Sequence, residues 1–497
     1  MTTAPQLRDA YCLFHEGILA LSQVETDGIR VDVPYLDRAL VEIEEKIKAL
    51  RERLRTHEVG RKWQRHFGLK MNLDSREQLG VILFSSQEKG GMGYKVEVWT
   101  GSGRPSTEES ELEKLEIGYV KGWLRYQKLQ KARSTYLMGI RREVVGGYVH
   151  PVYNLHFAIT YRSSSDSPNF QNQPVRDPEM AKLIRTAFIA SPGCVLVEHD
   201  LKGAEVCVAA CYHKDPVMID YIKDETKDMH RDMAMQLYFL EKGQVNKPIR
   251  HAAKNKFVFP QFYNDWYIAC AQALWEAIDR SKLTVDGRSL REHLLDHGIT
   301  GLGALDPEQK PRKGTFEKHV QDVEHDFWGR RFKEYAQWKK RWYEAYLKKG
   351  YFTTLTGFRI AGAMKRNEVI NYPIQGSAFH CLLWILIQTQ AELRRRKMRT
   401  RIVGQAHDSM VADVPVEELD VYLAMVEQIV TVQLPAYWKW IIVPMEMESA
   451  VCPLGTSWYD KREIVRVDTF NYRDPEGDVG TAKGLIKHWN HTYERTH

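Results

Sequence analysis

The sequence predicts an α+β fold in which one sheet is assembled from two separated stretches of the chain. Short β-patterned runs dominate from Gly146 to Cys211, and such runs return at residues 351–355 and 401–404. Helical patterning fills the segment between these stretches, and a helical segment also precedes the first one. We therefore expect a sheet-based core with a helical block inserted into it and an elongated helical arm before it.

The helical arm is predicted by a seam of apolar residues between positions 36 and 54. These residues recur at alternating spacings of four and three, which is typical of an amphipathic helix with a narrow apolar face. The seam consists of Leu36, Leu40, Ile43, Ile47, Leu50 and Leu54. Two glycine-rich segments follow, at residues 89–93 and 100–107. They predict a mobile loop between helical segments.

Composition sets only loose bounds on function. The chain has 497 residues, a formal net charge of +6 and seven cysteines. This length allows two or three domains, and the slightly basic charge is compatible with a polyanionic partner without identifying one. The odd cysteine number and the lack of a C-x-x-C spacing indicate reduced thiols in a cytoplasmic setting, with neither a disulfide framework nor a zinc site. Because no long uncharged apolar run occurs, we expect a soluble protein without a membrane partner.

Two aspartates stand where an apolar run meets polar residues. Asp200 ends the run Cys194-Val-Leu-Val-Glu-His-Asp, and Asp408 lies in Ile402-Val-Gly-Gln-Ala-His-Asp-Ser. Strands of this kind would bring the two carboxylates side by side at the edge of a sheet. Magnesium is usually held by one or two carboxylates plus substrate phosphates, and two such ions polarise both ends of an in-line phosphoryl displacement. The alternative is that both are surface aspartates at strand ends.

Six short blocks occur in a fixed order along nearly the whole chain. They are Met71-Asn-Leu-Asp-Ser-Arg-Glu-Gln-Leu79, Thr160-Tyr-Arg-Ser-Ser with Asn169-Phe-Gln-Asn-Gln-Pro174, Asp200-Leu-Lys-Gly-Ala-Glu205, Asp228-Met-His-Arg231, Asn371-Tyr-Pro-Ile-Gln-Gly376 and Gln405-Ala-His-Asp408. Together they resemble the characteristic blocks of the family A DNA polymerases, the group of bacterial DNA polymerase I. Any one block alone would be a weak indication, but six in order are a specific one.

The resemblance implies a right-hand polymerase fold with an antiparallel palm sheet, helical fingers and a helical thumb. The implied regions are an N-terminal palm-associated segment at 1–30, a thumb at 31–145, a palm at 146–227 and 351–460, fingers at 228–350 and a polar C-terminal tail at 461–497. Charged and glycine-containing residues near 279–314 predict a surface insertion on the fingers. The sequence indicates no function for this insertion or for the unperiodic tail. The compact form resembles virus-encoded, phage-like and plasmid-encoded members.

The resemblance also implies a metal site. Asp200 and Asp408 would be the ligands of two magnesium ions, with the backbone carbonyl of Leu201 helping. One ion would lower the pKa of the primer 3′ hydroxyl and the other would hold the triphosphate. His407 is implied to contact the primer end, although a core histidine would be the better interpretation if it stood alone. Ser409 replaces a glutamate that the family usually carries, and we interpret it as a tolerated variation.

A group of cations is expected to bind the incoming dNTP. Arg250 and Lys254 lie four residues apart, on one face of a helix, and the family's fold adds His230 nearby. These side chains suit a triphosphate, and Lys254 is also counted as catalytic. Most such pairs belong to a solvated charged face, but this segment continues into the apolar residues 257–259. Glu205 is implied to be a steric gate against the ribose 2′ hydroxyl, which is compatible with a buried glutamate paired to Arg or Tyr.

The aromatic residues of this helix depart from the family pattern. The usual spacing after Lys254 would place Val258 and Phe262 beside the nucleotide. A shift by one residue places Phe259 and Tyr263 there instead. Because Pro260 removes a backbone donor and clashes with the preceding turn, a kink or an extra-residue bulge is expected to produce this shift.

A further set of polar residues is implied to line the primer-template DNA on its minor-groove side. Long polar side chains suit the acceptors that all base pairs share in that groove. The set consists of Arg162, Asn169, Gln171, Asn371 and Gln375, with His407 at the primer end. Most Asn and Gln residues are merely polar surface residues, but these cluster in two of the resembling blocks.

The resulting expectation is a DNA-templated DNA polymerase. A single-subunit RNA polymerase of related fold is the alternative, and Glu205 argues against it because such an enzyme must accept the 2′ hydroxyl. An inactive nucleic-acid-binding module is a third alternative, against which the aspartate pair argues. Because the thumb-like helix begins within the first forty residues, we expect no proofreading or 5′ nuclease activity. A separate exonuclease or a processivity factor is not identifiable from the sequence.

Overall fold

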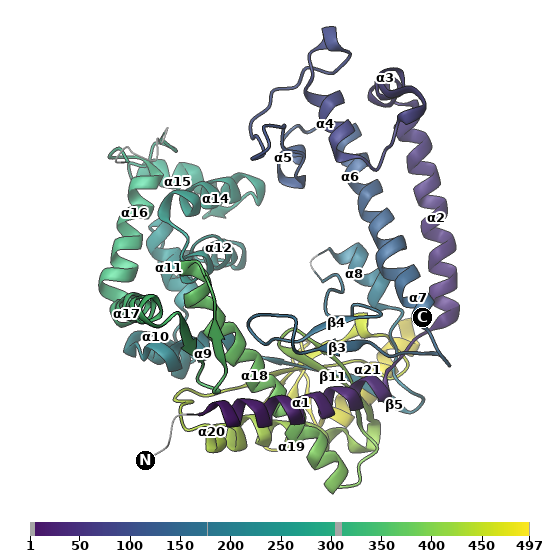
Figure 1. Ribbon diagram of the computed structural model, residues 1–497, viewed down its shortest axis with the longest axis vertical. Helices are drawn as coiled ribbons and strands as arrows, with labels where there is room; N and C mark the ends of the chain where they lie inside the picture. Colours follow the sequence, from purple (N-terminus) through teal and green to yellow (C-terminus); the bar gives the residue numbers. More distant parts are fainter. Residues whose placement is uncertain (1–4, 176, 304–310, 497) are drawn as a thin grey trace.

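The computed structural model of the chain describes residues 5–175, 177–303 and 311–496. Figure 1 shows a base that carries the sheet and two helical arms that rise from opposite ends of it. One arm is formed by residues 33–143 and the other by residues 204–349. The second arm is inserted between two stretches that both contribute strands to the base, as the sequence predicts.

The sheet of the base has seven strands, all antiparallel, in the order β10-β11-β5-β12-β13-β14-β15. Val195 and Val197 of β5 pack into one hydrophobic core and Leu196 into another, so this strand is buried on both faces. That burial explains its continuous apolar run. The strands are β5 Cys194–Leu201, β10 Arg401–Ala406, β11 Ser409–Pro415, β12 Met447–Val451, β13 Arg462–Arg466, β14 Tyr472–Arg473 and β15 Val479–Gly480.

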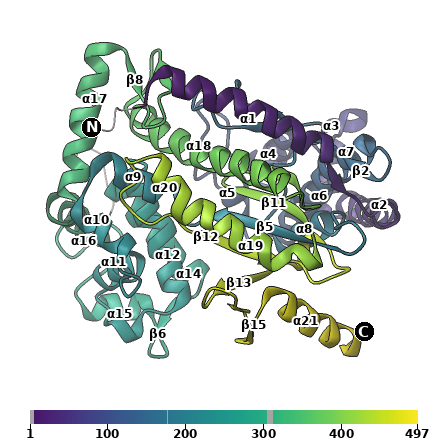
Figure 2. The same cartoon turned by 90° about the horizontal axis from the view of Figure 1, so that it is seen from below.

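Helices cover the face of the sheet that points away from the arms. Figure 2 shows α1 (Leu7–Asp27), α18 (Arg366–Arg395) and α19 (Leu419–Gln428) running side by side there. α1 approaches α18 closely because Gly17 has no side chain: a Cβ at this position would lie 2.7 Å from Leu383 Cδ2. This contact fixes the N-terminal helix against the core.

The segment after Trp458 differs from its expectation as an unperiodic tail. It adds β13, β14 and β15 to the edge of the sheet and ends in α21 (Ala482–Thr496). The Trp489 indole nitrogen donates a hydrogen bond to the buried Asp474 carboxylate at 2.8 Å, which ties α21 to the new strands. The tail is therefore an integral extension of the base.

The first arm follows the predicted seam closely. α2 (Val33–Thr56) begins at Asp32, whose side chain accepts a hydrogen bond from the Tyr35 backbone nitrogen. The six seam residues are buried or partly buried. The glycine-rich segments lie between α4 and α5, as expected of a connecting loop. The remaining helices of the arm are α3 Glu58–Phe67, α4 Arg76–Phe84, α5 Glu109–Glu113, α6 Gly118–Lys131 and α7 Met138–Glu143.

The second arm is helical, and the described residues of the stretch 279–314, where an insertion is expected, lie within it. Within it, β6 (Thr284–Val285) and β7 (Arg288–Ser289) form a small hairpin, and residues 304–310 lie outside the described residues. The helices of this arm are α9 Ala204–His213, α10 Pro216–Lys223, α11 Met229–Tyr238, α12 Lys247–Ala253, α13 Phe259–Phe262, α14 Tyr267–Arg280, α15 Leu290–Asp296, α16 Phe316–Asp326 and α17 Lys333–Lys349. In the described part of the chain, no helix has the length and apolar character needed to cross a membrane.

Candidate active site

Asp200 and Asp408 meet at the centre of the sheet, at the foot of the two arms. Asp200 lies at the end of β5, and Asp408 lies with His407 in the tight turn between β10 and β11. His407 adopts a left-handed backbone conformation (φ 53°), which the turn requires. The Leu201 backbone nitrogen donates to the Asp408 carbonyl oxygen at 3.1 Å, and this bond joins the two segments. Asp408 therefore lies one residue before β11, and the adjacent strands β5 and β11 bring the two aspartates close together.

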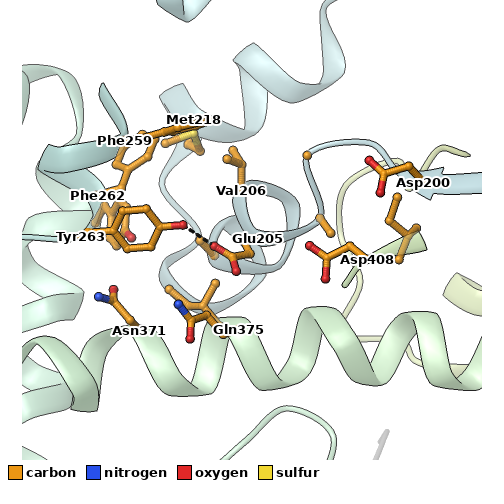
Figure 3. Close-up of a pocket in the computed structure, with 16 residues that line it drawn as sticks. Asp200, Glu205, Val206, Met218, Phe259, Phe262, Tyr263, Asn371, Gln375 and Asp408 are labelled. Atoms are coloured by element: carbon orange, nitrogen blue, oxygen red, sulfur yellow. Dashed lines mark hydrogen bonds between the residues drawn. The ribbon is translucent and has the colours of Figure 1, made fainter. Parts of the chain in front are cut away.

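Both aspartates line a pocket of about 360 Å³, shown in Figure 3. The pocket lies between the sheet and the helices of the second arm. It is lined by Asp200, Leu201, Gly203, Ala204, Glu205, Val206, Ala209, Met218, Phe259, Phe262, Tyr263, Tyr335, Asn371, Ile374, Gln375 and Asp408. The structure thus brings the expected metal ligands, gate residue and aromatic residues together.

The electrostatics of the aspartate pair suit a cation. Burial, followed by the charges of Asp408, Glu198 and Glu448, raises the pKa of Asp200 to about 7. A nearby positive ion would relieve this cost because it stabilises the charged carboxylate. Among residues 5–175, 177–303 and 311–496, no group of three or more His, Cys, Asp or Glu side chains could hold a metal by itself. Two aspartates with a backbone carbonyl fit magnesium, which takes its other ligands from phosphates and water.

Glu205 is positioned by the turn that leaves β5. Gly203 adopts a left-handed conformation (φ 57°) at the start of α9, which places Glu205 in the first turn of that helix. The Tyr263 hydroxyl donates to one Glu205 oxygen at 2.6 Å, and Arg162 donates to the other at 3.3 Å. Figure 3 shows the Tyr263 contact as a dashed line. The expected pairing with Arg or Tyr is present with both partners.

The cations expected to bind a triphosphate lie on α11, on α12 and on the first residue of the turn after α12. Arg250 donates to Asp228 Oδ2 at 2.5 Å. The Lys254 ammonium lies 5.1 Å from the centre of the Phe259 ring, and the His230 ring meets the same ring edge-on at 5.7 Å. Burial, together with the charges of Arg250 and Lys254, lowers the pKa of His230 to about 4. His230 is thus a neutral hydrogen-bonding group at neutral pH rather than the positive charge that the sequence suggested.

The helix that carries the aromatic residues contains the expected bulge. Residues Lys254–Val258 form a π-helical turn, in which the Phe259 backbone nitrogen donates to the Lys254 carbonyl. The turn inserts one extra residue immediately before Pro260. Phe259 and Tyr263 therefore face the pocket, whereas Val258 is fully buried. Phe262, which the unshifted spacing places beside the nucleotide, also lines the pocket wall.

The residues expected to contact primer-template DNA divide into two groups. Asn371 and Gln375 line the same pocket as the aspartates. Gln171 and His407 line a second, larger pocket of about 670 Å³ between the base and the first arm. Arg162 lies beside the aspartates. The exposed Asn169 uses its side-chain oxygen to accept the Asn172 backbone nitrogen at 3.0 Å, so it shapes its own loop.

Some residues at these sites were not singled out from the sequence. Arg76, Lys128 and Lys131 bring positive charge from the first arm to the second pocket. The i, i+3 spacing of the two lysines on α6 is a signal that could have indicated them. Gln405 accepts hydrogen bonds from Gln171 and Ser163 at 2.7 and 2.6 Å, which fixes the loop carrying Gln171 to β10.

Comparisons with known proteins agree with this geometry. A sequence model described as DNA polymerase family A matches residues 39–276 and 317–460. The chain is 28% identical to DNA polymerase I of Bacillus subtilis over 456 residues, covering 89% of this chain and 45% of that protein. It is 25% identical to a DNA polymerase of Bacillus phage SP01 over 456 residues, covering 81% and 45%. The chain therefore spans somewhat under half the length of these relatives.

The comparison with solved structures shows the fold. A solved structure described as the POL domain of Pol1 from M. smegmatis in complex with DNA primer-template and dNTP superposes with a TM-score of 0.68. It is 21% identical and covers 89% of this chain and 70% of that one. The expected right-hand fold, with an antiparallel palm sheet, helical fingers and helical thumb, is confirmed. Because the family match extends over most of the chain, the protein belongs to DNA polymerase family A.

Proposed function

We propose that this chain extends the 3′ hydroxyl of a primer with dNTPs on a DNA template, using two magnesium ions held at Asp200 and Asp408. The observation that carries the proposal is the placement of both aspartates, Glu205 and Tyr263 around one pocket. Magnesium, when bound, would activate the 3′ hydroxyl and neutralise charge on the triphosphate. Leu201 would add its backbone carbonyl to the metal site.

The chain's own residues orient the substrates. Arg250 and Lys254 would bind the triphosphate, Lys254 close to the reacting phosphate, and neutral His230 would donate a hydrogen bond to a phosphate oxygen. Phe259 would pack against the sugar. Glu205, held by Tyr263 and Arg162, would occupy the space beside the 2′ carbon and so exclude ribonucleotides.

The duplex would lie over the base and against the first arm. Gln171, Asn371 and Gln375 have long polar side chains suited to the minor-groove acceptors shared by all base pairs. Arg162 and Asn169 would line the same minor-groove side, Asn169 while also holding its own loop, and His407 would act at the primer end. The basic residues of the second pocket would contact phosphates, which give affinity without sequence preference.

The same resemblance supports the expected boundaries, with a palm-associated segment at 1–30, a thumb at 31–145, a palm at 146–227 and 351–460, and fingers at 228–350. We also propose that these regions carry no proofreading activity. A single-subunit RNA polymerase remains the alternative function. Glu205 argues against it because its carboxylate stands where a ribose hydroxyl would need room.

Primer extension tests the proposal directly. A labelled primer is incubated on DNA and RNA templates with magnesium and either dNTPs or NTPs, and full extension is expected with dNTPs on DNA. The Asp408→Asn variant controls for contaminating polymerases. Extension only with NTPs would support the alternative, and no extension under any condition would reject both. The lack of proofreading is tested separately. A primer with a mismatched 3′ end, incubated with magnesium and without nucleotides, should keep its length.

A further inference from the structure

Two π-helical turns face each other in the fingers. The first, Lys254–Val258, leads into α13, and the second, Phe327–Arg331, follows α16. Phe327 of the second turn packs against Phe257 and Phe262 of the first helix, with ring centres 5.4 and 5.8 Å apart. π turns are rare and are often found at functional sites. The contact between these two turns therefore needs a structural explanation.

Gln261 joins the two turns through its side chain, which is fully buried. Its amide nitrogen donates to Glu324 Oε1 at 2.7 Å, and its amide oxygen accepts from the Trp328 indole nitrogen at 2.7 Å. The Lys339 ammonium lies over the face of the Trp328 ring, 3.3 Å from its centre. This cation–π contact helps to fix the orientation of the indole. Both ends of the buried amide are therefore paired.

The position of Gln261 relates it to the nucleotide pocket. It lies two residues from both Phe259 and Tyr263, which on a helix places its side chain on the opposite face, about 200° away. A shift of the helix by one residue would present Pro260 or Phe262 to Glu324 and Trp328. That shift would leave the partly buried Glu324 carboxylate and Trp328 indole without this partner, and it would move the fully buried Gln261 amide away from both, which is costly.

We propose that Gln261 is a positioning residue that holds the bulged register of this helix and thereby sets sugar selectivity. The hydrogen bonds to Glu324 and Trp328 are satisfied only when Phe259 and Tyr263, not Val258, face the pocket. Selectivity then depends on Gln261 although it does not touch the nucleotide. This inference rests on the proposed polymerase function.

Gln261→Leu tests the inference kinetically. The ratio of kcat/KM for dNTPs to that for dideoxynucleotides and ribonucleotides is expected to change by about tenfold. The exchange Gln261→Glu with Glu324→Gln preserves both hydrogen bonds and should restore the parental ratio. Trp328→Phe removes one donor while keeping a ring, and it provides a milder second variant if Gln261→Leu folds poorly.

Gln236→Leu is the matched control. Gln236 lies on α11 and also reaches α16 and the second π turn, donating to Asp326 at 3.0 Å and accepting from Arg331 at 3.5 Å, but among the described residues its side chain makes no hydrogen bond to Lys254–Val258 or α13. Its loss should lower the Tm without changing the selectivity ratio. If Gln261→Leu likewise lowered only the Tm, Gln261 would be merely structural and the inference would be overturned.

Thiol labelling tests the register without any activity. In a Cys12→Ser background, which removes the exposed cysteine, Phe259→Cys should react quickly and Val258→Cys slowly. Adding Gln261→Leu should speed the labelling of Val258→Cys, and unchanged labelling would contradict the inference. A parent that extends no primer but shows the expected labelling would reject the proposed function while leaving the register lock standing.

Discussion

Arg162 Nη2 lies 3.1 Å from Asp408 Oδ1, so a guanidinium occupies the charge environment of an expected metal ligand. The other terminal nitrogen of Arg162 contacts Glu205. Arg162 is expected to line the primer-template DNA on its minor-groove side, so its positive charge would serve the duplex while it also competes with a metal ion for Asp408.

Replacing Arg162 with Gln should therefore have opposite effects on two ligands. Without DNA, Mn²⁺ should bind about tenfold more tightly because its competitor for Asp408 is removed. Primer-template binding should weaken. Titration of Mn²⁺ by electron paramagnetic resonance and of labelled DNA by anisotropy measures the two effects. Equal or weaker Mn²⁺ binding in the variant would show that Arg162 does not restrain Asp408.

Loss of either aspartate should abolish extension while leaving DNA binding nearly unchanged. Asp200→Asn or Asp408→Asn removes a metal ligand, and a loss of about a thousandfold or more in kcat/KM is expected. Phosphate contacts elsewhere dominate affinity for the duplex. Ser409→Ala, which removes only a hydroxyl bonded to the Ala406 carbonyl, should retain substantial activity. Near-parental extension by Asp408→Asn would disprove the metal assignment.

Glu205→Ala should narrow the preference for dNTPs over NTPs by at least about tenfold, because the group that clashes with a 2′ hydroxyl is removed. General activity is also expected to fall, since Tyr263 and Arg162 both lose a partner. Tyr263→Phe separates the two effects: it removes the 2.6 Å hydrogen bond but keeps the carboxylate. Single-nucleotide incorporation kinetics measure both the preference for dNTPs over NTPs and the general activity. Unchanged discrimination in an active Glu205→Ala variant would exclude the gate.

The sequence predicts the sheet and the first arm well because their signals are local. The apolar run before Asp200 and the seam of α2 each reflect burial within one element. The tail was missed because the adjacent apolar residues Ile464 and Val465 do not alternate with polar ones in the sequence, although β13 buries the first and exposes the second. Its stability comes from the neighbouring strand and from Trp489, neither of which a local pattern contains.

The sequence allows residues to be proposed for the candidate site, but it does not indicate which side chains contact one another there. Pro260 gave a local reason for a bulge, which the structure contains. The partners of that bulge are not local: Trp328 lies 67 residues from Gln261, and Arg162 lies 246 residues from Asp408. Side-chain pairs at such separations depend on how whole elements pack, and one sequence carries no record of that packing.

Acid should destabilise the protein through three buried histidines. Burial lowers the pKa of His199, His213 and His380 to about 3, below the ordinary value of 6.5. The unfolded chain therefore binds more protons, and stability is complete above pH 6.5 and falls as the pH drops toward 3. Each histidine should contribute about 1.4 kcal/mol per pH unit in this range.

Urea unfolding at several pH values measures this slope. His380 accepts or donates one hydrogen bond with Thr356 and stacks on Phe358, so His380→Gln should lower overall stability but flatten the slope by about one proton. His15→Gln, at an exposed position on α1, controls for the substitution itself. A slope unaffected by His380→Gln would mean that this residue is protonated in the folded state.

The register of the fingers helix gives opposite predictions for two neighbouring residues. In this family, tyrosine beside the incoming sugar admits dideoxynucleotides and phenylalanine discriminates against them. Phe259 faces the pocket, so the parent should resist dideoxy termination and Phe259→Tyr should become markedly more sensitive. Val258→Tyr should chiefly damage packing, because Val258 is fully buried. Termination ladders at graded ratios of ddNTP to dNTP measure sensitivity. Sensitivity gained by Val258→Tyr, with Phe259→Tyr behaving like the parent, would mean that the helix meets the nucleotide without the π turn.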